Sequence, residues 1–267
     1  MRQEERGWRR RDGLTRIIAL ANQKGGVGKT TTAVNLGAAL AELGQRVLLI
    51  DMDPQASLTR YLAVDPNGSH KTIAHLIGER DTPLAAVLQR TASGVDIVPS
   101  NEDLAGVVMD LRRSLGTWQR ALQRKLLPDA AGYDYVLIDP PPEAGELLML
   151  TLVASTEVFV VMQCEMDSYE KMTTLLAIID LAREELAPGL RLSGIVPTMY
   201  VMRARHCREI VAALHAHYDG LVFQTVINRS IRLADAFAAH QPVTQFDTRS
   251  DAAKAYRSLA REVLNGR

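Results

Sequence analysis

The stretch ANQKGGVGKTTT, at residues 21–32, limits the fold of this chain more than any other feature of its sequence. A short apolar run precedes the stretch and a segment with helical spacing follows it, so its glycines lie between a predicted strand and a predicted helix. Glycines at such a junction let the backbone curl closely around an anion, and the free amides at the start of the helix point toward that anion. The stretch therefore predicts a phosphate-binding loop at the end of a buried strand.

Short apolar runs alternate with longer segments of helical period from residue 15 onward. Most of these runs are apolar at successive positions, as is typical of strands that are covered on both faces. The alternation indicates a single α/β domain of the P-loop NTPase type, with a mostly parallel, twisted sheet flanked by helices on both faces. The predicted strands are residues 16–21, 46–51, 95–100, 133–139, 157–163, 192–199 and 222–227.

Two helices can be placed from their apolar spacing. The segment after the glycines has this spacing from Lys29 to Leu43, and Gly44 is placed to end the helix in a left-handed conformation. The segment DAAKAYRSLAREVLNGR, at 251–267, carries a stripe of mostly small residues. We expect this helix to dock on the core rather than to anchor in a membrane. Its stripe consists of Ala253, Tyr256, Leu259, Ala260 and Val263.

Composition limits the compartment and the partners. Lys plus Arg and Asp plus Glu both total 31, so a nucleic-acid site would have to be local. No apolar run approaches the roughly 20 residues that span a bilayer, and the N-terminal residues lack the apolar stretch of a signal peptide. Cys164 and Cys207 show no metal-binding or redox spacing, which is typical of inert thiols in a reducing compartment. We expect a cytoplasmic protein with no membrane partner.

The N-terminal residues differ from the rest of the chain. Residues 1–16 contain six arginines against Glu4, Glu5 and Asp12, with little that could be buried. We expect residues 1–15 to be a disordered, arginine-rich arm in front of a folded domain at 16–267. A weak contact with nucleic acid is the alternative role for the arm.

The residues that end the glycine loop suit phosphate and magnesium chemistry. Lys29 is placed to reach the β- and γ-phosphates of a nucleotide, and the hydroxyl of Thr30 is placed to ligate Mg²⁺. The acids that end the strand at 46–51, with Asp53 just beyond it, are suited to serve a metal ion and an attacking water. The nucleotide-binding residues predicted in the loop are Lys24, Gly25, Gly26, Val27, Gly28, Lys29, Thr30 and Thr31.

The loop departs from the standard pattern G-x-x-x-x-G-K-[ST], because Gln23 stands at the position of the first glycine and Lys24 follows it. The resulting K-G-G-x-G-K-T-T form resembles the deviant Walker A box of the ParA/MinD family of ATPases. This resemblance implies ATP and Mg²⁺ as cofactors. It also implies that Lys24 reaches across a dimer interface to the nucleotide of the partner.

The resemblance extends from about residue 16 to the C-terminal helix. VLLIDMDPQASLT, at 47–59, looks like the segment after the family's second strand, where Asp53 would orient the attacking water. YDYVLIDPPP, at 133–142, ends its apolar run in Asp139, the Walker B position that would hold Mg²⁺ through water. The family usually reads D-C-P-P-S there, so Pro140 and Glu143 predict a stiffer or more acidic switch loop. The catalytic residues that follow from the resemblance are Lys24, Lys29 and Asp53.

Two further segments extend the resemblance. VVMQCE, at 160–165, resembles the V-Q-x-E stretch of the family, and VFQTVINRSIRLADA, at 222–236, resembles the segment beside the adenine. The second match implies that Asn228 and Arg229 contact the nucleotide. Because Asn228 and Ser230 replace a proline and an asparagine of the family, the contact with the base is less defined than the contacts with the phosphates.

Members of this family differ in what they act on. Arg203 and Arg232 match positions where partition members carry nonspecific DNA contacts. The resemblance therefore implies a ParA/Soj-type partition ATPase, nucleoid-associated, which dimerises around ATP and binds DNA nonspecifically as that dimer. Its slow hydrolysis would be stimulated by a ParB-like partner, and the cycle would drive chromosome or plasmid segregation.

Other members of the family remain to be weighed. A MinD-like or cargo-positioning ATPase that acts on a membrane or protein scaffold is the alternative. An iron protein is not expected, because the switch position directly after Asp139 carries prolines and neither cysteine of the chain. Residues before position 16 leave no room for a helix-turn-helix, so autorepression is not expected either.

Overall fold

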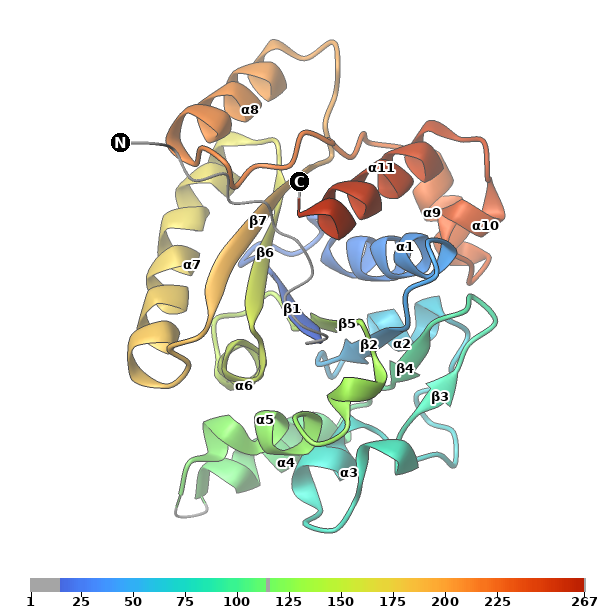
Figure 1. Cartoon of the computed structure of the whole chain (residues 1–267), viewed down its shortest axis with the longest axis vertical. Helices are drawn as coiled ribbons and strands as arrows, with labels where there is room; N and C mark the ends of the chain where they lie inside the picture. The colour runs from blue at the N-terminus through green and yellow to red at the C-terminus, as the bar shows by residue number, and fades with distance from the viewer. Residues whose placement is uncertain (1–14, 114–115, 267) are drawn as a thin grey trace.

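The computed structural model describes residues 15–113 and 116–266 (Figure 1). One seven-stranded sheet has the order β3–β4–β2–β5–β1–β6–β7. Neighbouring strands are parallel except for β3 and β4, which are antiparallel. The strands are β1 (Arg16–Ala21), β2 (Val47–Asp51), β3 (Gln89–Arg90), β4 (Asp96–Val98), β5 (Tyr135–Asp139), β6 (Glu157–Gln163) and β7 (Arg191–Thr198).

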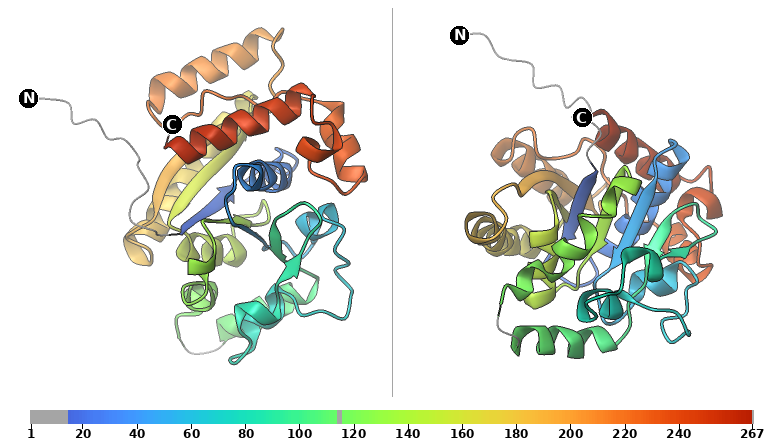
Figure 2. Two further views of the ribbon diagram at one scale, coloured as in Figure 1. Left: turned by 45° about the vertical axis from the view of Figure 1, so that its right-hand side comes forward. Right: turned by 60° about the horizontal axis from the view of Figure 1, so that its bottom comes forward.

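Helices cover both faces of the sheet (Figures 1 and 2). One face carries α1 (Lys29–Glu42), α2 (Ser57–Tyr61), α9 (Ile231–Ala238), α10 (Val243–Phe246) and α11 (Asp251–Asn265). The other carries α3 (Ile73–Gly78), α4 (Asp103–Arg113), α5 (Ala121–Leu126), α6 (Glu146–Ala154), α7 (Met166–Glu185) and α8 (Arg205–His217). Short 3₁₀ turns lie at η1 (Leu84–Ala86), η2 (Trp118–Arg120) and η3 (Ala130–Gly132). The predicted fold, a single α/β domain with a mostly parallel sheet, is confirmed.

Successive residues of the central strand β1 pack on opposite sides of the sheet. Ile18 and Leu20 lie in the core beneath α1 and α11, whereas Ile17 and Ala19 face the helices of the other layer. All four are almost fully buried. Both faces of the strand must therefore be apolar, which explains its unbroken apolar sequence.

The two predicted helices are confirmed. Gly44 follows α1 with a φ of 79°, a left-handed conformation that glycine adopts without steric cost. The whole predicted stripe of α11 is buried. The hydroxyl of Tyr256 lies 3.3 Å from that of Thr32, so α11 docks directly on α1.

The strand predicted at 222–227 is wrong. Only Val222 and Asn228 form isolated bridges, with Ile195 and Tyr200. Between them, the amides of Gln224 and Thr225 donate to the carboxylate of Glu262 on α11 instead of to a strand. A side chain thus takes the hydrogen bonds that would have extended the sheet. Sequence patterning also missed the two-residue edge strand β3, which has no apolar residue.

Residues 1–14 of the predicted arm lie outside the described residues, so the arm remains a prediction. Thr15, its last residue, is described, and its hydroxyl lies 2.8 Å from the carbonyl oxygens of Ala130 and Tyr133. Among the helices at 15–113 and 116–266, none combines the length and apolar character needed to cross a membrane.

Candidate nucleotide-binding site

The order of the strands brings the predicted site residues to one edge of the sheet. The glycine loop follows β1, and β1 pairs with β5, which ends in Asp139. On the other side of β5 lies β2, and its last residue, Asp51, is in register with Asp139. Because all three strands are parallel, their carboxyl ends meet at the same edge, where ligands bind in open α/β sheets.

The glycine loop is shaped to accept a group against its backbone. Gly26 and Gly28 have φ values of 76° and 92°, in the left-handed region that favours glycine. A Cβ built on Gly25 or Gly26 would meet no atom within 4 Å, so the space over these residues is open. Gly28 caps the 14-residue helix α1 without a side-chain hydrogen bond, which leaves the first amides of the helix for an anion.

Neighbouring strands hold the loop from behind. The side-chain nitrogen of Asn22 donates to the carbonyl of Val161 on β6 at 2.5 Å, and its side-chain oxygen accepts from the backbone amide of Lys24 at 2.6 Å. Thr198, at the end of β7, donates its hydroxyl to the carbonyl of Val27 at 2.7 Å. The loop is therefore fixed before any ligand is bound, which lowers the entropy cost of binding.

Lys29, Thr30 and Asp139 lie together. The hydroxyl of Thr30 donates to Oδ2 of Asp139 at 2.6 Å, and Nζ of Lys29 lies 3.9 Å from Oδ1. Asp139 is 1% exposed, and its Oδ1 accepts no hydrogen bond. Burial raises the pKa of Asp139, whereas Lys29 and the Thr30 hydroxyl act in the opposite direction. A buried carboxylate oxygen with spare capacity beside a hydroxyl fits a hydrated divalent cation.

Asp53 follows β2 at the same edge. Its backbone amide donates to Oδ1 of Asp51 at 3.1 Å, and its carboxylate accepts from the amide of Gln55 at 2.9 Å. The amide of Met52, the residue before Asp53, donates to the carbonyl of Asp139 at 2.9 Å, and the charge of Asp53 adds to the raised pKa of Asp139. The structure thus brings the predicted water-orienting acid beside the predicted magnesium residue.

Lys24 turns toward the start of α7 in the same chain. Its Nζ lies 2.8 Å from Glu165 and 3.3 Å from Asp167, which is also 3.3 Å from Lys171. The hydrogen bond that Lys24 donates to Glu165 raises the pKa of Lys24. Sequence reasoning matched Glu165 to the V-Q-x-E stretch but did not identify it as a partner of Lys24, since 141 residues separate the two.

Asn228 and Arg229 follow a segment that runs along the end of β7. Asn228 pairs with Tyr200 just beyond the end of β7, and a Cβ on Gly28 would be 4.0 Å from the methyl carbon of Met199. The side-chain oxygen of Asn228 is buried without a hydrogen bond, whereas Arg229 is exposed. Their contacts with a nucleotide remain a prediction.

The two predicted DNA-binding arginines have different surroundings. Arg203 is exposed in the turn before α8 and forms no ion pair with any residue of the described ranges. Arg232, at the start of α9, has guanidinium nitrogens 3.4 Å from both Asp235 and Asp247. Two carboxylates therefore already offset much of the charge of Arg232. Contacts of Arg203 and Arg232 with DNA remain a prediction.

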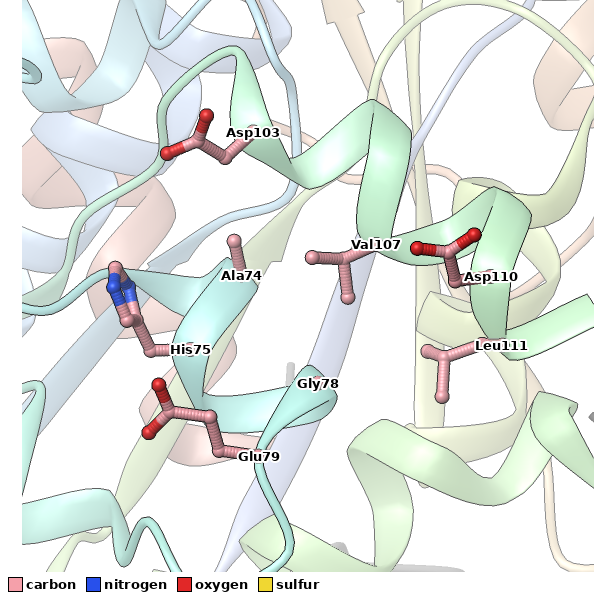
Figure 3. Close-up of a pocket in the computed structure, with 8 residues that line it drawn as sticks. All are labelled: Ala74, His75, Gly78, Glu79, Asp103, Val107, Asp110 and Leu111. Atoms are coloured by element: carbon pink, nitrogen blue, oxygen red, sulfur yellow. The ribbon is translucent and has the colours of Figure 1, made fainter.

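A separate hollow of about 460 Å³ lies between α3 and α4 (Figure 3). None of the residues predicted for the nucleotide site lines it. Its walls are Ala74, His75, Gly78, Glu79, Asp103, Val107, Asp110 and Leu111. This hollow is not part of the site at the strand ends.

Comparison with known proteins agrees with this site. The AAA domain family model matches residues 15–192. The chain is 41% identical to the chromosome-partitioning ATPase Soj of Thermus thermophilus, over 93% of this chain and 95% of Soj. It is 37% identical to the chromosome partitioning protein ParA of Caulobacter vibrioides, over 94% of each chain. The chain belongs to the ParA/MinD family of ATPases.

A solved structure shows the same fold. The crystal structure of cobyrinic acid a,c-diamide synthase from Mycobacterium smegmatis, with a bound ATP analog and magnesium, superimposes with a TM-score of 0.82. It is 35% identical to this chain and covers 94% of it and 95% of the synthase chain. The family thus has members with different described activities on one fold, so function has to be argued from the site.

Proposed function

We propose that this protein is a ParA/Soj-type ATPase that dimerises on binding ATP and Mg²⁺, binds DNA nonspecifically as that dimer, and releases it after hydrolysis. The observation that carries the proposal is the group of Lys29, Thr30 and Asp139 at the end of the glycine loop, in which the buried Oδ1 of Asp139 accepts no hydrogen bond. The similarity to Soj and ParA supports chromosome or plasmid segregation as the process served.

Each residue of the group has a role that follows from its position. Lys29 and the amides at the start of α1 bind the phosphates and offset their charge. Thr30 and Asp139 hold Mg²⁺, Asp139 through water, and the ion would neutralise charge that develops on the phosphate oxygens. Asp53 orients the attacking water. Asn228 and Arg229 would contact the base.

Lys24 is the residue that supports a dimer in this proposal. In the described chain its charge is held by Glu165 and Asp167, which makes it unavailable to the phosphates of its own loop. In the ATP dimer, Lys24 would leave these carboxylates and contact the nucleotide bound to the partner. Hydrolysis would therefore be slow until the dimer forms and a ParB-like activator binds to it.

DNA binding is the part of the proposal that depends on the fewest residues. Dimerisation brings two copies of Arg203 and of Arg232 onto one surface of a protein with equal numbers of acids and bases. Since Arg232 is already paired with Asp235 and Asp247, we expect Arg203 to contribute more. Nucleoid association in the cytoplasm would follow from this binding.

The test is DNA affinity with Mg-ATP at several salt concentrations. Each phosphate neutralised contributes about −0.9 to the slope of log K against log salt, so Arg203→Ala in both subunits should flatten the slope by roughly two. Arg232→Ala should flatten it less, and Arg183→Ala, an exposed arginine paired with Asp180 on α7, should not change it. ATP turnover without DNA should persist in all three variants.

The same samples separate the main alternative. The ATP-bound protein should co-sediment with DNA and not with vesicles that contain anionic lipid. Binding to the vesicles instead, with unchanged salt slopes for the arginine variants, would favour a MinD-like ATPase that acts on a membrane. Binding to neither would favour a protein scaffold.

A further inference from the structure

Asp51 and Asp139 end neighbouring strands in the same register, yet their oxygens meet different partners. Asp51 is 0% exposed, and both of its carboxylate oxygens accept hydrogen bonds from the chain itself. Oδ1 accepts from the amide of Asp53 at 3.1 Å, and Oδ2 accepts from the amide and hydroxyl of Thr59 at 2.9 Å and 2.7 Å. Asp51 therefore faces the segment that carries Asp53, and the chain itself already donates to both of its carboxylate oxygens.

The hydroxyl of Thr59 extends this set of bonds to a third strand. Besides donating to Asp51, it accepts from the backbone amide of Ser100 at 2.9 Å. Ser100 lies two residues beyond the end of β4, which is the strand next to β2. Thr59 is 0% exposed, so all of these bonds lie in the interior, where hydrogen bonds to a carboxylate are strong.

These contacts close the segment 52–58 at both of its ends. Asp53 itself is held by its neighbours: its amide donates to Asp51, and it accepts from the amides of Gln55 and Ala56, while the amide of Met52 donates to the carbonyl of Asp139 at 2.9 Å. Within the segment, Ala56 is buried with a φ of 53°, a conformation that residues other than glycine adopt only when their surroundings enforce it. The direction of the Asp53 side chain therefore depends on the hydrogen bonds between Asp51 and Thr59, which hold the two ends of the segment together.

We propose that Asp51 and Thr59 are positioning residues that hold the carboxylate of Asp53 toward the phosphate site. The Thr59 hydroxyl is the group on which this orientation depends. The inference rests on the proposed role of Asp53 in ATP hydrolysis. Neither residue touches the glycine loop in the described contacts, so ATP binding and hydrolysis should separate. A displacement of about 1 Å in a catalytic group can cost on the order of 100-fold in rate.

The experiment compares Thr59→Val with Thr59→Ser. Valine keeps the volume of threonine but removes the hydroxyl, and with it one of the two bonds to Asp51 and the bond to Ser100, whereas serine keeps the hydroxyl. We expect Thr59→Val to lower kcat for Mg-ATP by about 10- to 100-fold while KM stays within about twofold. Thr59→Ser should restore kcat to near the wild-type value. Thr151→Val, which removes another fully buried threonine hydroxyl on α6, serves as the control and should leave kcat unchanged.

Affinity for a fluorescent ATP analog and urea unfolding are measured on the same variants. Unchanged kcat in Thr59→Val, a parallel loss in Thr59→Ser, or an increase in KM that matches the fall in kcat would each overturn the positioning role. Failure of the proposed function is a different result: the wild type would not hydrolyse ATP, or Asp53→Ala would hydrolyse it at the full rate. If Thr59→Val does not fold, Asp51→Asn is judged by the same separation of kcat from KM.

Discussion

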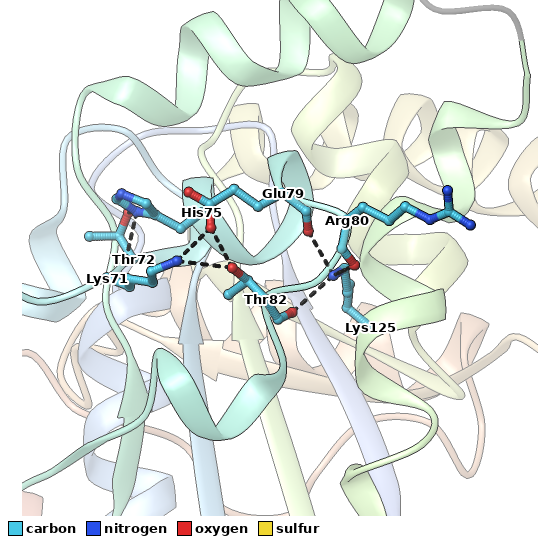
Figure 4. A network of polar contacts seen from close by, with 7 residues as sticks. All are labelled: Lys71, Thr72, His75, Glu79, Arg80, Thr82 and Lys125. Carbon is cyan, nitrogen blue, oxygen red and sulfur yellow. Dashed lines mark hydrogen bonds and ion pairs between the residues drawn. The ribbon is translucent and has the colours of Figure 1, made fainter.

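Lysine, threonine and a carboxylate meet at two places in this molecule, and the two groups behave differently. In the phosphate site, Lys29, Thr30 and Asp139 are buried or half-buried, and one carboxylate oxygen accepts no hydrogen bond. Around the end of α3, a second group forms a closed triangle in which Lys71 and Thr82 both donate to Oε2 of Glu79 (Figure 4). The ion pair of this triangle is roughly half exposed.

The difference shows what makes a binding site. The residue types are nearly the same, but in the triangle Lys71 and Thr82 also bond to each other, at 3.1 Å, so the chain satisfies its own polar groups. In the group of Lys29, Thr30 and Asp139, the lysine nitrogen lies 3.9 Å from the carboxylate, and the buried Oδ1 of Asp139 accepts no hydrogen bond. A buried polar atom that lacks a hydrogen-bond partner, rather than the residue types, therefore distinguishes a group that can bind a ligand.

Replacement of Lys24 should have the largest effect at the phosphate site. Lys24→Ala should keep ATP binding, because Lys29 and the loop amides remain, but should lose ATP-dependent dimerisation and hydrolysis. Charge supplied across an interface can be worth roughly 10³ to 10⁵ in rate. Light scattering with Mg-ATP measures the dimer, and Lys171→Ala, which removes the other lysine on Asp167, is the matched control. Normal dimerisation of Lys24→Ala would exclude a role across the interface.

Asp139→Asn should have the next largest effect. The amide can still accept the Thr30 hydrogen bond but loses the charge that attracts a hydrated cation, so hydrolysis should fall by about 100-fold or more. Glu79→Gln makes the same chemical change in the closed triangle and should leave hydrolysis unchanged. Steady-state ATPase rates over a Mg²⁺ titration check both variants. Equal losses of ATPase rate in Asp139→Asn and Glu79→Gln would contradict the difference between the phosphate site and the closed triangle.

The sequence predicts the fold and the phosphate loop because both depend on local patterns. Strands covered on both faces must be apolar at every position, and a loop that wraps an anion requires glycines at fixed places. Segments that are shaped by distant side chains are harder to predict. The residues at 222–227 look like a strand, but Glu262 on a later helix accepts from the amides of Gln224 and Thr225, so only the ends of the segment pair with β7.

The two acids of the site show a similar limit. Asp51 and Asp139 both end apolar runs with the same last letters, LID, so sequence alone does not distinguish their roles. The distinction comes from the donors that fold against each carboxylate: Thr59 for Asp51, and Thr30 for Asp139. The pairing of Lys24 with Glu165 was likewise outside the reach of local patterns, although both residues were matched to family motifs.

Stability without nucleotide should depend on pH through the buried acids. Burial first, and then the charge of Asp139, raises the pKa of Asp51 from 3.8 to about 7. The folded state thus holds a proton that the unfolded state releases at lower pH, so this contribution to stability is present at low pH and is lost as the pH rises through about 7. We expect a loss on the order of 2 kcal/mol between pH 5 and pH 8.

Urea unfolding in EDTA at a series of pH values measures this loss, and the ¹³C shift of the Asp51 carboxyl follows its ionisation directly. The closed triangle should contribute with the opposite sign and in another range, since the hydrogen bond from Lys71 lowers the pKa of Glu79. Its contribution is lost only as the pH falls below about 4.5, the ordinary value for that group. An Asp51 carboxyl that is already ionised at pH 5 would contradict the prediction.

Lys125→Met should have the smallest effect, and only on stability. Beside the triangle, the Nζ of Lys125 donates to the carbonyls of Glu79, Arg80 and Thr82 at 2.7–2.9 Å and so holds the turn that follows α3 (Figure 4). Methionine keeps the length of the side chain but leaves these carbonyls to water, at a cost of about 1–2 kcal/mol in the free energy of unfolding. The ATPase rate should not change, because the chain completes this group without a ligand. Lys254→Met, which breaks only an exposed pair with Asp251, is the control and should shift urea unfolding far less. A Lys125→Met protein of unchanged stability would show that the three hydrogen bonds of Lys125 contribute no more than an ordinary surface pair.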